Sequence, residues 1–386
     1  MKSNYKQLGQ FIRQVDIRNT DGKEDNLLGV SVQKKFIPSI ANTVGTDFRK
    51  YKIVKRGQFT YIPDTSRRGD KIAIALLLDY EEGIVSNVYT VFEVIDENQL
   101  LSEYLMLWFM RPEFDRYARF KSHGSVREVM DWDEMCKVEL PVPEIEKQRQ
   151  IVKAYNTINE RIALKRKIND NLEAQAQACF NNLFAVDIDS LPVGWKVAKV
   201  GDYCVDNVAN LSKNEEFNTI LYLDTGSVTQ NYISSLQELN LTEDEIPSRA
   251  KRKVADGDIV YSTVRPNLKH YALIQNPPHN LIASTGFAVL SNKGLGVSNE
   301  LLYLWLTKPS VLEYLQAIAE NSVSTYPSLN VTDLLNVEII VPDADTLAEF
   351  NRFLKIMFSA IEDNNNQIKA LMNTQAILLP KLMSSR

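Results

Sequence analysis

IVKAYNTINERIALKRKINDNLEAQAQACFNNL, residues 151–183, is the stretch that decides the fold of this chain. Its ladder of positions advances by alternating steps of four and three, the spacing of a helix that packs against another helix. The ladder runs through Ile151, Tyr155, Ile158, Ile162, Lys165, Asn169, Leu172, Ala176, Cys179 and Leu183. Such a long run exceeds the usual length of a surface helix, so it predicts a coiled-coil helix.

The same ladder returns 199 positions further along the chain. It reads Phe350, Leu354, Met357, Ile361, Asn364, Ile368, Leu371, Gln375, Leu378 and Leu382. Each ladder follows an apolar strand that ends in Val-Pro, at 138–143 (VELPVP) and at 337–342 (VEIIVP). The polar positions within the ladders, such as Lys165 and Asn364, are typical of residues that fix helix register. The sequence therefore predicts a duplicated unit, each copy a domain followed by a helix.

Short motifs upstream of each helix repeat in the same order. VKRGQFTY at 54–61 matches VADGDIVY at 254–261, and LMLWFMRP at 105–112 matches LYLWLTKP at 302–309. Short strands broken by Gly, Pro and Asn are expected in the first copy, followed by one helical stretch over 100–120. The expected strands are Gly29–Val32, Gln58–Ile62, Lys71–Leu78 and Val88–Ile95.

Length and composition limit the classes of protein. A chain of 386 residues predicts two or three domains. No stretch is long or apolar enough to span a membrane, and the N-terminus has no apolar signal region. The cysteines Cys136, Cys179 and Cys204 are scattered, which suits a reducing cytoplasm and excludes a Cys-rich zinc site. The net charge of −5 is only weak evidence against nucleic-acid binding, because phosphate affinity depends on local patches.

Catalytic motifs are missing from the sequence. The histidines His123, His270 and His279 have no neighbouring ligand cluster, so no metal site is predicted. Asn276-Pro-Pro-His279 is similar to the Asn-Pro-Pro-aromatic motif of amino-methyltransferases, but histidine replaces the aromatic residue and no glycine-rich cofactor loop is present. A turn is the preferred interpretation, with a self-sufficient methyltransferase as an alternative hypothesis.

Basic residues cluster at the same place in both copies. They are Arg49, Lys50, Lys52, Lys55, Arg56, Arg67, Arg68 and Lys71 in the first, and Arg249, Lys251, Arg252, Lys253, Arg265 and Lys269 in the second. A solvated basic face would explain one cluster, whereas recurrence favours two equivalent contacts with an anion such as DNA.

Polar loops adjoin these clusters. STVRPNLK at 262–269 combines short hydrogen-bonding side chains with Arg and Lys, a composition suited to base edges and phosphates. Its counterpart follows Tyr61, and the loops at 121–127 and 320–326 have similar composition. The predicted DNA contacts are Lys34, Lys35, Arg67, Arg68, Lys121, Ser125, Arg127, Arg252, Thr263, Arg265, Asn267, Lys269, Ser322, Ser324 and Tyr326.

The chain resembles the specificity subunit of a type I restriction-modification system. The resemblance is carried by LPVPEIEKQRQIV at 140–152, LPVGWKVAKVGDY at 191–203 and GDIVYSTVRPNLK at 257–269. The start of the second helix departs from the family pattern, because PDADT at 342–346 lacks the Gln-Arg pair.

The resemblance implies an α+β fold with two duplicated β-rich target-recognition domains, separated by two long helices that form an antiparallel coiled coil. The expected boundaries are 1–142 for the first domain, 143–185 for the central helix, 186–341 for the second domain and 342–386 for the C-terminal helix. The apolar residues of the two ladders would form the coiled-coil contacts.

The resemblance also implies a non-catalytic DNA reader that is needed for both modification and restriction. Each domain would read one half of a bipartite asymmetric site in double-stranded DNA. The helices, about 50 Å long at 1.5 Å per residue, would set the half-site spacing and dock two methyltransferase (M) subunits. Cofactors would belong to the partners: S-adenosylmethionine in the M subunits, and ATP and Mg in the restriction (R) subunits. The alternative is a structural adaptor that binds protein through the coiled coil.

Overall fold

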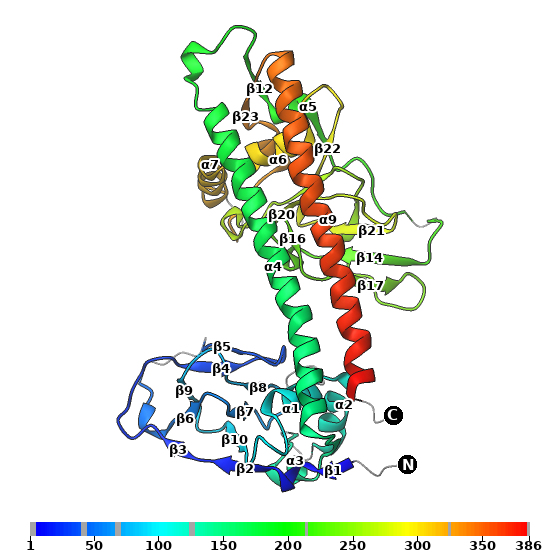
Figure 1. The fold of residues 1–386 in the computed structure, drawn as a ribbon. Helices are drawn as coiled ribbons and strands as arrows, with labels where there is room; N and C mark the ends of the chain where they lie inside the picture. The colour runs from blue at the N-terminus through cyan, green and yellow to red at the C-terminus, as the bar shows by residue number, and fades with distance from the viewer. Residues whose placement is uncertain are drawn as a thin grey trace. The chain divides into compact units, whose positions relative to one another are not determined.

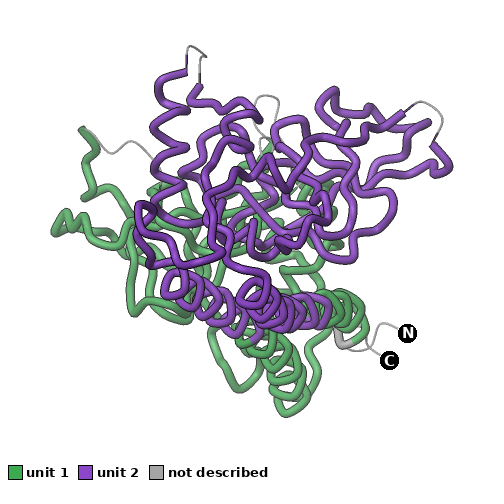
Figure 2. Tube along the Cα trace, turned by 90° about the horizontal axis from the view of Figure 1, so that it is seen from above, with its two compact units in different colours: residues 1–164, 368–386 green, residues 165–367 purple. Residues whose placement is uncertain are grey.

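The computed structural model describes residues 5–39, 45–65, 71–122, 128–212, 215–322 and 326–383. The chain forms two compact units (Figure 2). Unit 1 contains residues 1–164 and 368–386, and unit 2 contains residues 165–367. The two long helices, α4 (Ile145–Leu183) and α9 (Ala344–Met383), are drawn in Figure 1, and each contributes residues to both units. Each unit therefore contains a segment of each long helix.

Unit 1 is built on a four-stranded antiparallel sheet in the order β2-β10-β7-β8. Its strands are β2 (Ile12–Val15), β10 (Thr90–Val94), β7 (Phe59–Tyr61) and β8 (Ile74–Leu76). Three smaller sheets are present among the described residues of this unit. One pairs β1 (Tyr5–Gln7) with β11 (Glu139–Pro141), and another pairs β4 (Leu28–Val30) with β5 (Phe36–Pro38). In the third, β6 (Lys52–Lys55) lies between β3 (Ile17–Arg18) and β9 (Glu82–Val85). The helices are α1 (Ser102–Phe109), α2 (Pro112–Lys121) and α3 (Trp132–Cys136), with the 3-10 turns η1 (Leu8–Gln10) and η2 (Phe48–Lys50).

Unit 2 repeats this plan with the sheet order β13-β22-β19-β20. Its strands are β13 (Cys204–Asp206), β22 (Phe287–Asn292), β19 (Ile259–Ser262) and β20 (Tyr271–Leu273). The other sheets are β12 (Lys196–Lys199) with β23 (Glu338–Val341), β17 (Gln237–Asn240)-β14 (Thr219–Leu223)-β21 (Leu281–Ser284)-β18 (Ala250–Lys253), and β15 (Val228–Thr229) with β16 (Tyr232–Ile233). The helices are α5 (Val200–Tyr203), α6 (Asn299–Thr307), α7 (Pro309–Glu320) and α8 (Val331–Leu335), with η3 (Ile188–Ser190), η4 (Thr225–Ser227) and η5 (Pro266–Leu268).

The repeated motifs occupy equivalent places in the two units. Tyr61 and Tyr261 are fully buried on the central strands β7 and β19. Gly9 and Gly201 lie just before the first strand of each main sheet and lack the positive φ that glycine permits. They are instead sites of close approach: a Cβ on Gly9 would lie 2.8 Å from the Cβ of Cys136 at the end of α3. A Cβ on Gly201 would meet a backbone carbonyl at the end of α8 at 3.1 Å. The predicted duplication is confirmed.

The single helical stretch expected over 100–120 is wrong, because the chain forms α1 and α2 there. Pro112 occupies the first turn of α2, and the preceding Arg111 has an extended backbone. Proline has no N–H and disfavours helical backbone in the residue before it, so it begins a new helix. The same break occurs in unit 2 at Pro309.

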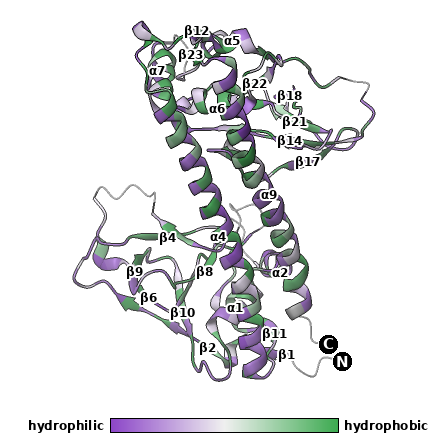
Figure 3. Ribbon diagram, turned by 45° about the horizontal axis from the view of Figure 1, so that its top comes forward, coloured by the Kyte–Doolittle hydropathy of each residue, from purple (hydrophilic) through white to green (hydrophobic). Residues whose placement is uncertain are grey.

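The long helices pair in antiparallel fashion. In unit 2, Lys165 of α4 binds Asn364 of α9, whereas the later Phe184 packs against the earlier Phe350. Both helices carry hydrophobic and hydrophilic residues along their length (Figure 3). Of the predicted coiled-coil residues, the structure buries Ile151, Tyr155, Ile162, Phe350, Leu354 and Ile361. Half-buried are Ile158, Leu172, Leu183, Met357, Leu371 and Leu378.

The ladder read from the sequence is wrong at its end in α4. Cys179 is exposed, while Phe180 is fully buried against Trp305 of α6, with ring centroids 4.9 Å apart. In α9, Phe358 is likewise fully buried, against Tyr303 of α6 at 5.7 Å. A straight α-helix drifts by about 20° per heptad, and here the drift turns the buried face toward the core of unit 2. The helices are therefore part of each unit's core as well as partners of one another.

Candidate nucleic-acid interface

Backbone hydrogen bonds in unit 2 join the loop after β19 to the segment before α8. The N–H of Arg265 donates to the carbonyl of Pro327 at 3.0 Å, and the N–H of Leu329 donates to the carbonyl of Thr263 at 2.7 Å. The loop at 262–269 that the sequence singled out is thereby held to residues 327–329, which directly follow the second such loop, 320–326.

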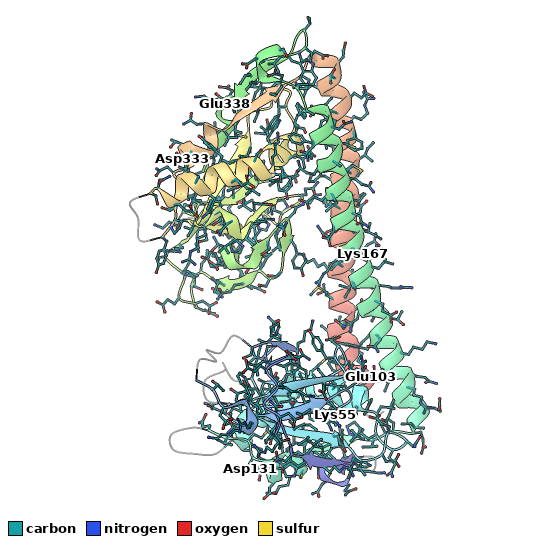
Figure 4. All side chains as sticks on the ribbon, turned by 90° about the vertical axis from the view of Figure 1, so that its left-hand side faces the viewer. Lys55, Glu103, Asp131, Lys167, Asp333 and Glu338 are labelled. Atoms are coloured by element: carbon teal, nitrogen blue, oxygen red, sulfur yellow. The ribbon has the colours of Figure 1, made fainter. Side chains whose placement is uncertain are left out.

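Unit 1 contains the same pair of hydrogen bonds. The N–H of Thr65 donates to the carbonyl of Glu128 at 2.9 Å, and the N–H of Met130 donates to the carbonyl of Pro63 at 3.0 Å. The segments are anchored beyond this point by short helices: Asp131 caps α3, and Asp333 of α8 accepts the N–H of Asn330 at 2.8 Å. Figure 4 labels both carboxylates. We call residues 63–65, 121–122 and 128–130 the loop pair of unit 1, and residues 262–269, 320–322 and 326–329 the loop pair of unit 2.

Left-handed backbone shapes the loop pair of unit 2. Arg265 (φ +50°) and Lys269 (φ +56°) flank the short turn η5, although neither is glycine. Non-glycine residues in this region carry strain of about 1 kcal/mol or more and persist only where the surroundings hold them. The N–H of Asn267 is held by the Oε1 of Gln316 from α7 at 3.0 Å. The side chains of Arg265, Asn267 and Lys269 are exposed.

An aromatic ring and hydroxyl groups complete this surface. The guanidinium carbon of Arg265 lies 5.2 Å from the ring centroid of Tyr326, whose side chain is exposed. Thr263 donates its hydroxyl to the carbonyl of Gly286 at 3.1 Å, and the Oγ of Ser322 accepts the N–H of Ser328 at 3.3 Å. The loop pair of unit 2 therefore gathers Thr263, Arg265, Asn267, Lys269, Ser322 and Tyr326.

Among the described residues at the loop pair of unit 1, Lys121 is the predicted contact. Lys121 ends α2, with its Nζ 3.9 Å from a carboxylate oxygen of Glu134. The neighbouring Ser122 hydroxyl accepts the hydroxyl hydrogen of Thr65 at 2.8 Å. Lys35 is exposed. The predicted contacts Arg67, Arg68, Ser125, Arg127 and Ser324, with His123, lie outside the described residues.

Lys34, predicted as a DNA contact, is buried in unit 1. Its Nζ lies 2.6 Å from Oδ1 of Asp115, with side-chain exposures of 6% and 13%. Burial lowers the pKa of Lys34, although the hydrogen bond to Asp115 opposes that shift. Asp115 also accepts the N–H of Ile72 at 3.2 Å. This ion pair ties α2 to the turn between β4 and β5, so Lys34 serves the fold.

Arg252, another predicted contact, is also occupied within its own unit. Its guanidinium donates to the carbonyl of Phe287 and to Oδ1 of Asn207, and burial lowers its pKa. At the equivalent place in unit 1, Lys52 donates to the carbonyl of Tyr89 at 2.8 Å. Both cations bind a carbonyl at the start of a central strand, β22 or β10. Some residues of the predicted basic clusters therefore form hydrogen bonds that stabilise the fold of their own unit.

A pocket of about 800 Å³ in unit 2 escaped the sequence analysis. Its lining combines α4, the η5 loop and α7, segments far apart along the chain. The lining includes the carboxylates of Asp170, Glu173, Glu313 and Glu320, which make it unsuited to phosphate. Glu173 accepts the hydroxyl hydrogen of the fully buried Tyr303 at 2.5 Å, and burial raises the pKa of Glu173.

In the part of the chain that the structure describes, no three His, Cys, Asp or Glu side chains gather as metal ligands. Among the same residues, no helix combines the length and the apolar character needed to cross a membrane.

Comparisons with known proteins agree on one family. A family model described as "Type I restriction modification DNA specificity domain" matches residues 11–174 and 192–373. The chain is 29% identical over 155 residues to the type I restriction enzyme HindI specificity subunit of Haemophilus influenzae, a match covering 39% of this chain and 32% of that subunit. It is 25% identical over 316 residues to the MjaIX specificity subunit of Methanocaldococcus jannaschii, covering 75% of this chain and 70% of that one.

A solved structure supports the fold. The chain is similar to the crystal structure of the type I restriction-modification S subunit from M. genitalium, with 12% identity and a TM-score of 0.55. The alignment covers 99% of this chain and 96% of that one. The expected α+β fold with two β-rich domains and long helices is confirmed.

Proposed function

Since the chain belongs to the type I restriction-modification DNA specificity family, we propose that it is the subunit that reads the DNA sequence for a larger modification and restriction complex. Each unit reads one half of a bipartite asymmetric site. The chain itself is non-catalytic and acts in the cytoplasm. Two M subunits supply S-adenosylmethionine-dependent methylation, and R subunits add ATP- and Mg-dependent restriction.

The observation that carries this proposal is the recurrence of the loop pair in both units. In each copy, the loop that follows a central strand is joined by the same two backbone hydrogen bonds to the segment that precedes a short helix. Duplicated scaffolds that present equivalent polar loops suit two contacts with one duplex, because phosphate contacts position a protein and side chains at base edges specify the sequence. The proposed contacts among the described residues are Lys35, Lys121, Thr263, Arg265, Asn267, Lys269, Ser322 and Tyr326.

The long helices are proposed as spacer and docking element. α4 is a continuous helix of 39 residues, which corresponds to about 58 Å at 1.5 Å per residue. Each long helix carries an exposed apolar side chain, Ile356 of α9 at 66% and Leu164 of α4 at 59%. We propose that the helices at 143–185 and 342–386 act as elements separate from the two recognition domains at 1–142 and 186–341.

Polar residues between the helices support a role in register. The Nζ of Lys165 donates to Oδ1 of Asn364 at 3.0 Å, and Nδ2 of Asn364 donates to Oδ1 of Asn169 at 2.9 Å. Lys165 thus binds the residue that occupies its own position in the second repeat, 199 residues later. Polar layers of this kind fix register because any shift leaves their groups without partners. We propose that this layer fixes the length between the half-sites.

Replacement of Arg265 tests the proposal. The methylated motif is first read from host genomic DNA with and without this gene. Binding of the complex with M subunits is then measured on the specific duplex and on duplexes altered in either half-site. Arg265→Ala should weaken binding to the intact site about 5- to 150-fold, the range of one good base contact, and lower discrimination in one half-site only. Lys196→Ala, an exposed cation on β12 of the same unit that lies outside both basic clusters and the loop pair, is the matched control. Unchanged affinities for specific and off-site DNA in Arg265→Ala would contradict the assignment.

A further inference from the structure

The ring of Tyr326 is held outward at the loop pair of unit 2. Its side chain is 58% exposed, large for an aromatic residue. The next residue, Pro327, accepts the N–H of Arg265 at 3.0 Å, so the backbones that carry the ring and the guanidinium are tied together. The guanidinium lies 5.2 Å from the ring centroid, within the range of a cation–π contact. The ring is therefore braced by a cation in a loop proposed to face DNA.

Unit 1 shows the same combination of ring and cation. Phe120, near the end of α2, is 80% exposed, and the Nζ of Lys121 lies 5.9 Å from its ring centroid. The next residue, Ser122, is bound to Thr65 of the loop pair of unit 1. Each unit thus places one exposed aromatic ring and one cation beside its loop pair.

The chemistry of duplex DNA restricts what such a ring can contact. Bases within an intact stack present only their edges in the grooves. An aromatic face can stack on a base only where a step has been opened, and proteins that insert apolar or aromatic wedges stabilise such openings. Methyltransferases create an opening of this kind, because they rotate the target base out of the helix to reach it. One methylated base in each half-site would require one wedge in each unit.

We propose that Tyr326, braced by Arg265, enters the base stack of its half-site and fills the space left when the M subunit rotates the target base outward. This inference rests on the proposed function. The ligand class is an unstacked base step in double-stranded DNA, and the ring face rather than the hydroxyl makes the contact. Phe120, which has no hydroxyl, serves the other half-site in the same way.

Base extrusion by the assembled complex with M subunits tests the proposal. A duplex carries the fluorescent base 2-aminopurine at the target position of one half-site, and its fluorescence rises on extrusion. Tyr326→Ala should reduce the extruded fraction about ten-fold, on the scale of base–aromatic stacking, in one half-site only. Tyr326→Phe should retain the wild-type signal. Tyr314→Ala is the matched control, because Tyr314 lies on α7 of the same unit and is 55% exposed.

A binding measurement gives a second readout that does not depend on extrusion. An abasic site at the target position already contains the gap, so the wild-type complex and Tyr326→Phe should prefer abasic over intact duplex more strongly than Tyr326→Ala does. A full 2-aminopurine signal in Tyr326→Ala, or equal loss in the Ala and Phe variants, would overturn the stacking role. A wild-type complex that bound specific and scrambled duplexes equally would instead refute the proposed function.

Discussion

Replacement of Lys34 by methionine should destabilise unit 1 rather than simply weaken DNA binding. The ammonium lies 2.6 Å from Oδ1 of Asp115, and both side chains are almost fully excluded from water. Methionine keeps the length of the side chain, and among the described residues it leaves the Asp115 carboxylate with the N–H of Ile72 at 3.2 Å as its remaining hydrogen bond. Removal of one member of a buried ion pair costs about 3–5 kcal/mol, because the other charge remains buried.

The double variant Lys34→Met/Asp115→Leu should recover much of this loss. It removes both charges and leaves one backbone N–H unsatisfied, at a cost of about 1–3 kcal/mol. The expected order of stability is therefore wild type, then the double variant, then Lys34→Met. Lys35→Met is the matched control, since Lys35 is the exposed neighbour and should change stability by less than about 0.5 kcal/mol.

Hydrogen exchange measured by mass spectrometry on peptides from β8 and α2 provides the assay. A loss of 3 kcal/mol raises the opening equilibrium by about 150-fold, which is easily resolved. DNA binding is measured in parallel on the folded fraction. If Lys34→Met left exchange unchanged but weakened binding as a surface cation would, the structural role assigned to Lys34 would be refuted.

Three further predictions concern unit 2. Burial raises the pKa of Glu173 above its ordinary 4.5, so the folded state binds a proton more tightly than the unfolded state does. Stability therefore falls as pH rises from 4.5 through the raised pKa. Glu173→Gln, which still accepts the hydroxyl hydrogen of Tyr303, should flatten that fall in thermal melts measured over a range of pH. Asn364→Leu removes the acceptor of Lys165 and should shift the methylated half-site spacing or impair assembly before it changes base choice, as sequencing of modified genomes would reveal. Gly201→Ala places a Cβ 3.1 Å from a carbonyl of α8 and should lower stability by about 1–3 kcal/mol in denaturant titrations.

The sequence was sufficient for the duplicated plan because local patterns encode it. Tyr61 and Tyr261 sit on matching strands, each after a glycine with positive φ, and the heptad ladders lie on the two long helices. The ladder failed at Cys179 because a third element, α6, draws Phe180 into the core of unit 2. A heptad period read along the sequence cannot show that α6 packs against the same helix and changes which side chain is buried.

The proposed interface was predictable in position but not residue by residue. The composition of 262–269 pointed to the loop that carries Arg265, and the structure brings that loop to its partner segment. Lys34 and Arg252 look the same in sequence as exposed cations, but their partners Asp115 and Asn207 lie 81 and 45 residues away. The acidic pocket beside η5 was invisible for the same reason.

Exchange of the second reading domain tests the central claim most directly. Residues 190–340 are replaced by the corresponding domain of a specificity subunit with a known, different motif, and the methylated sequence is read from genomic DNA in cells that also express the M subunits. If each unit reads one half of the site, the new motif keeps one half-site and the spacing while the other half-site takes the donor's sequence. A chimaera in which both half-sites changed, or in which the original motif remained intact, would contradict the account.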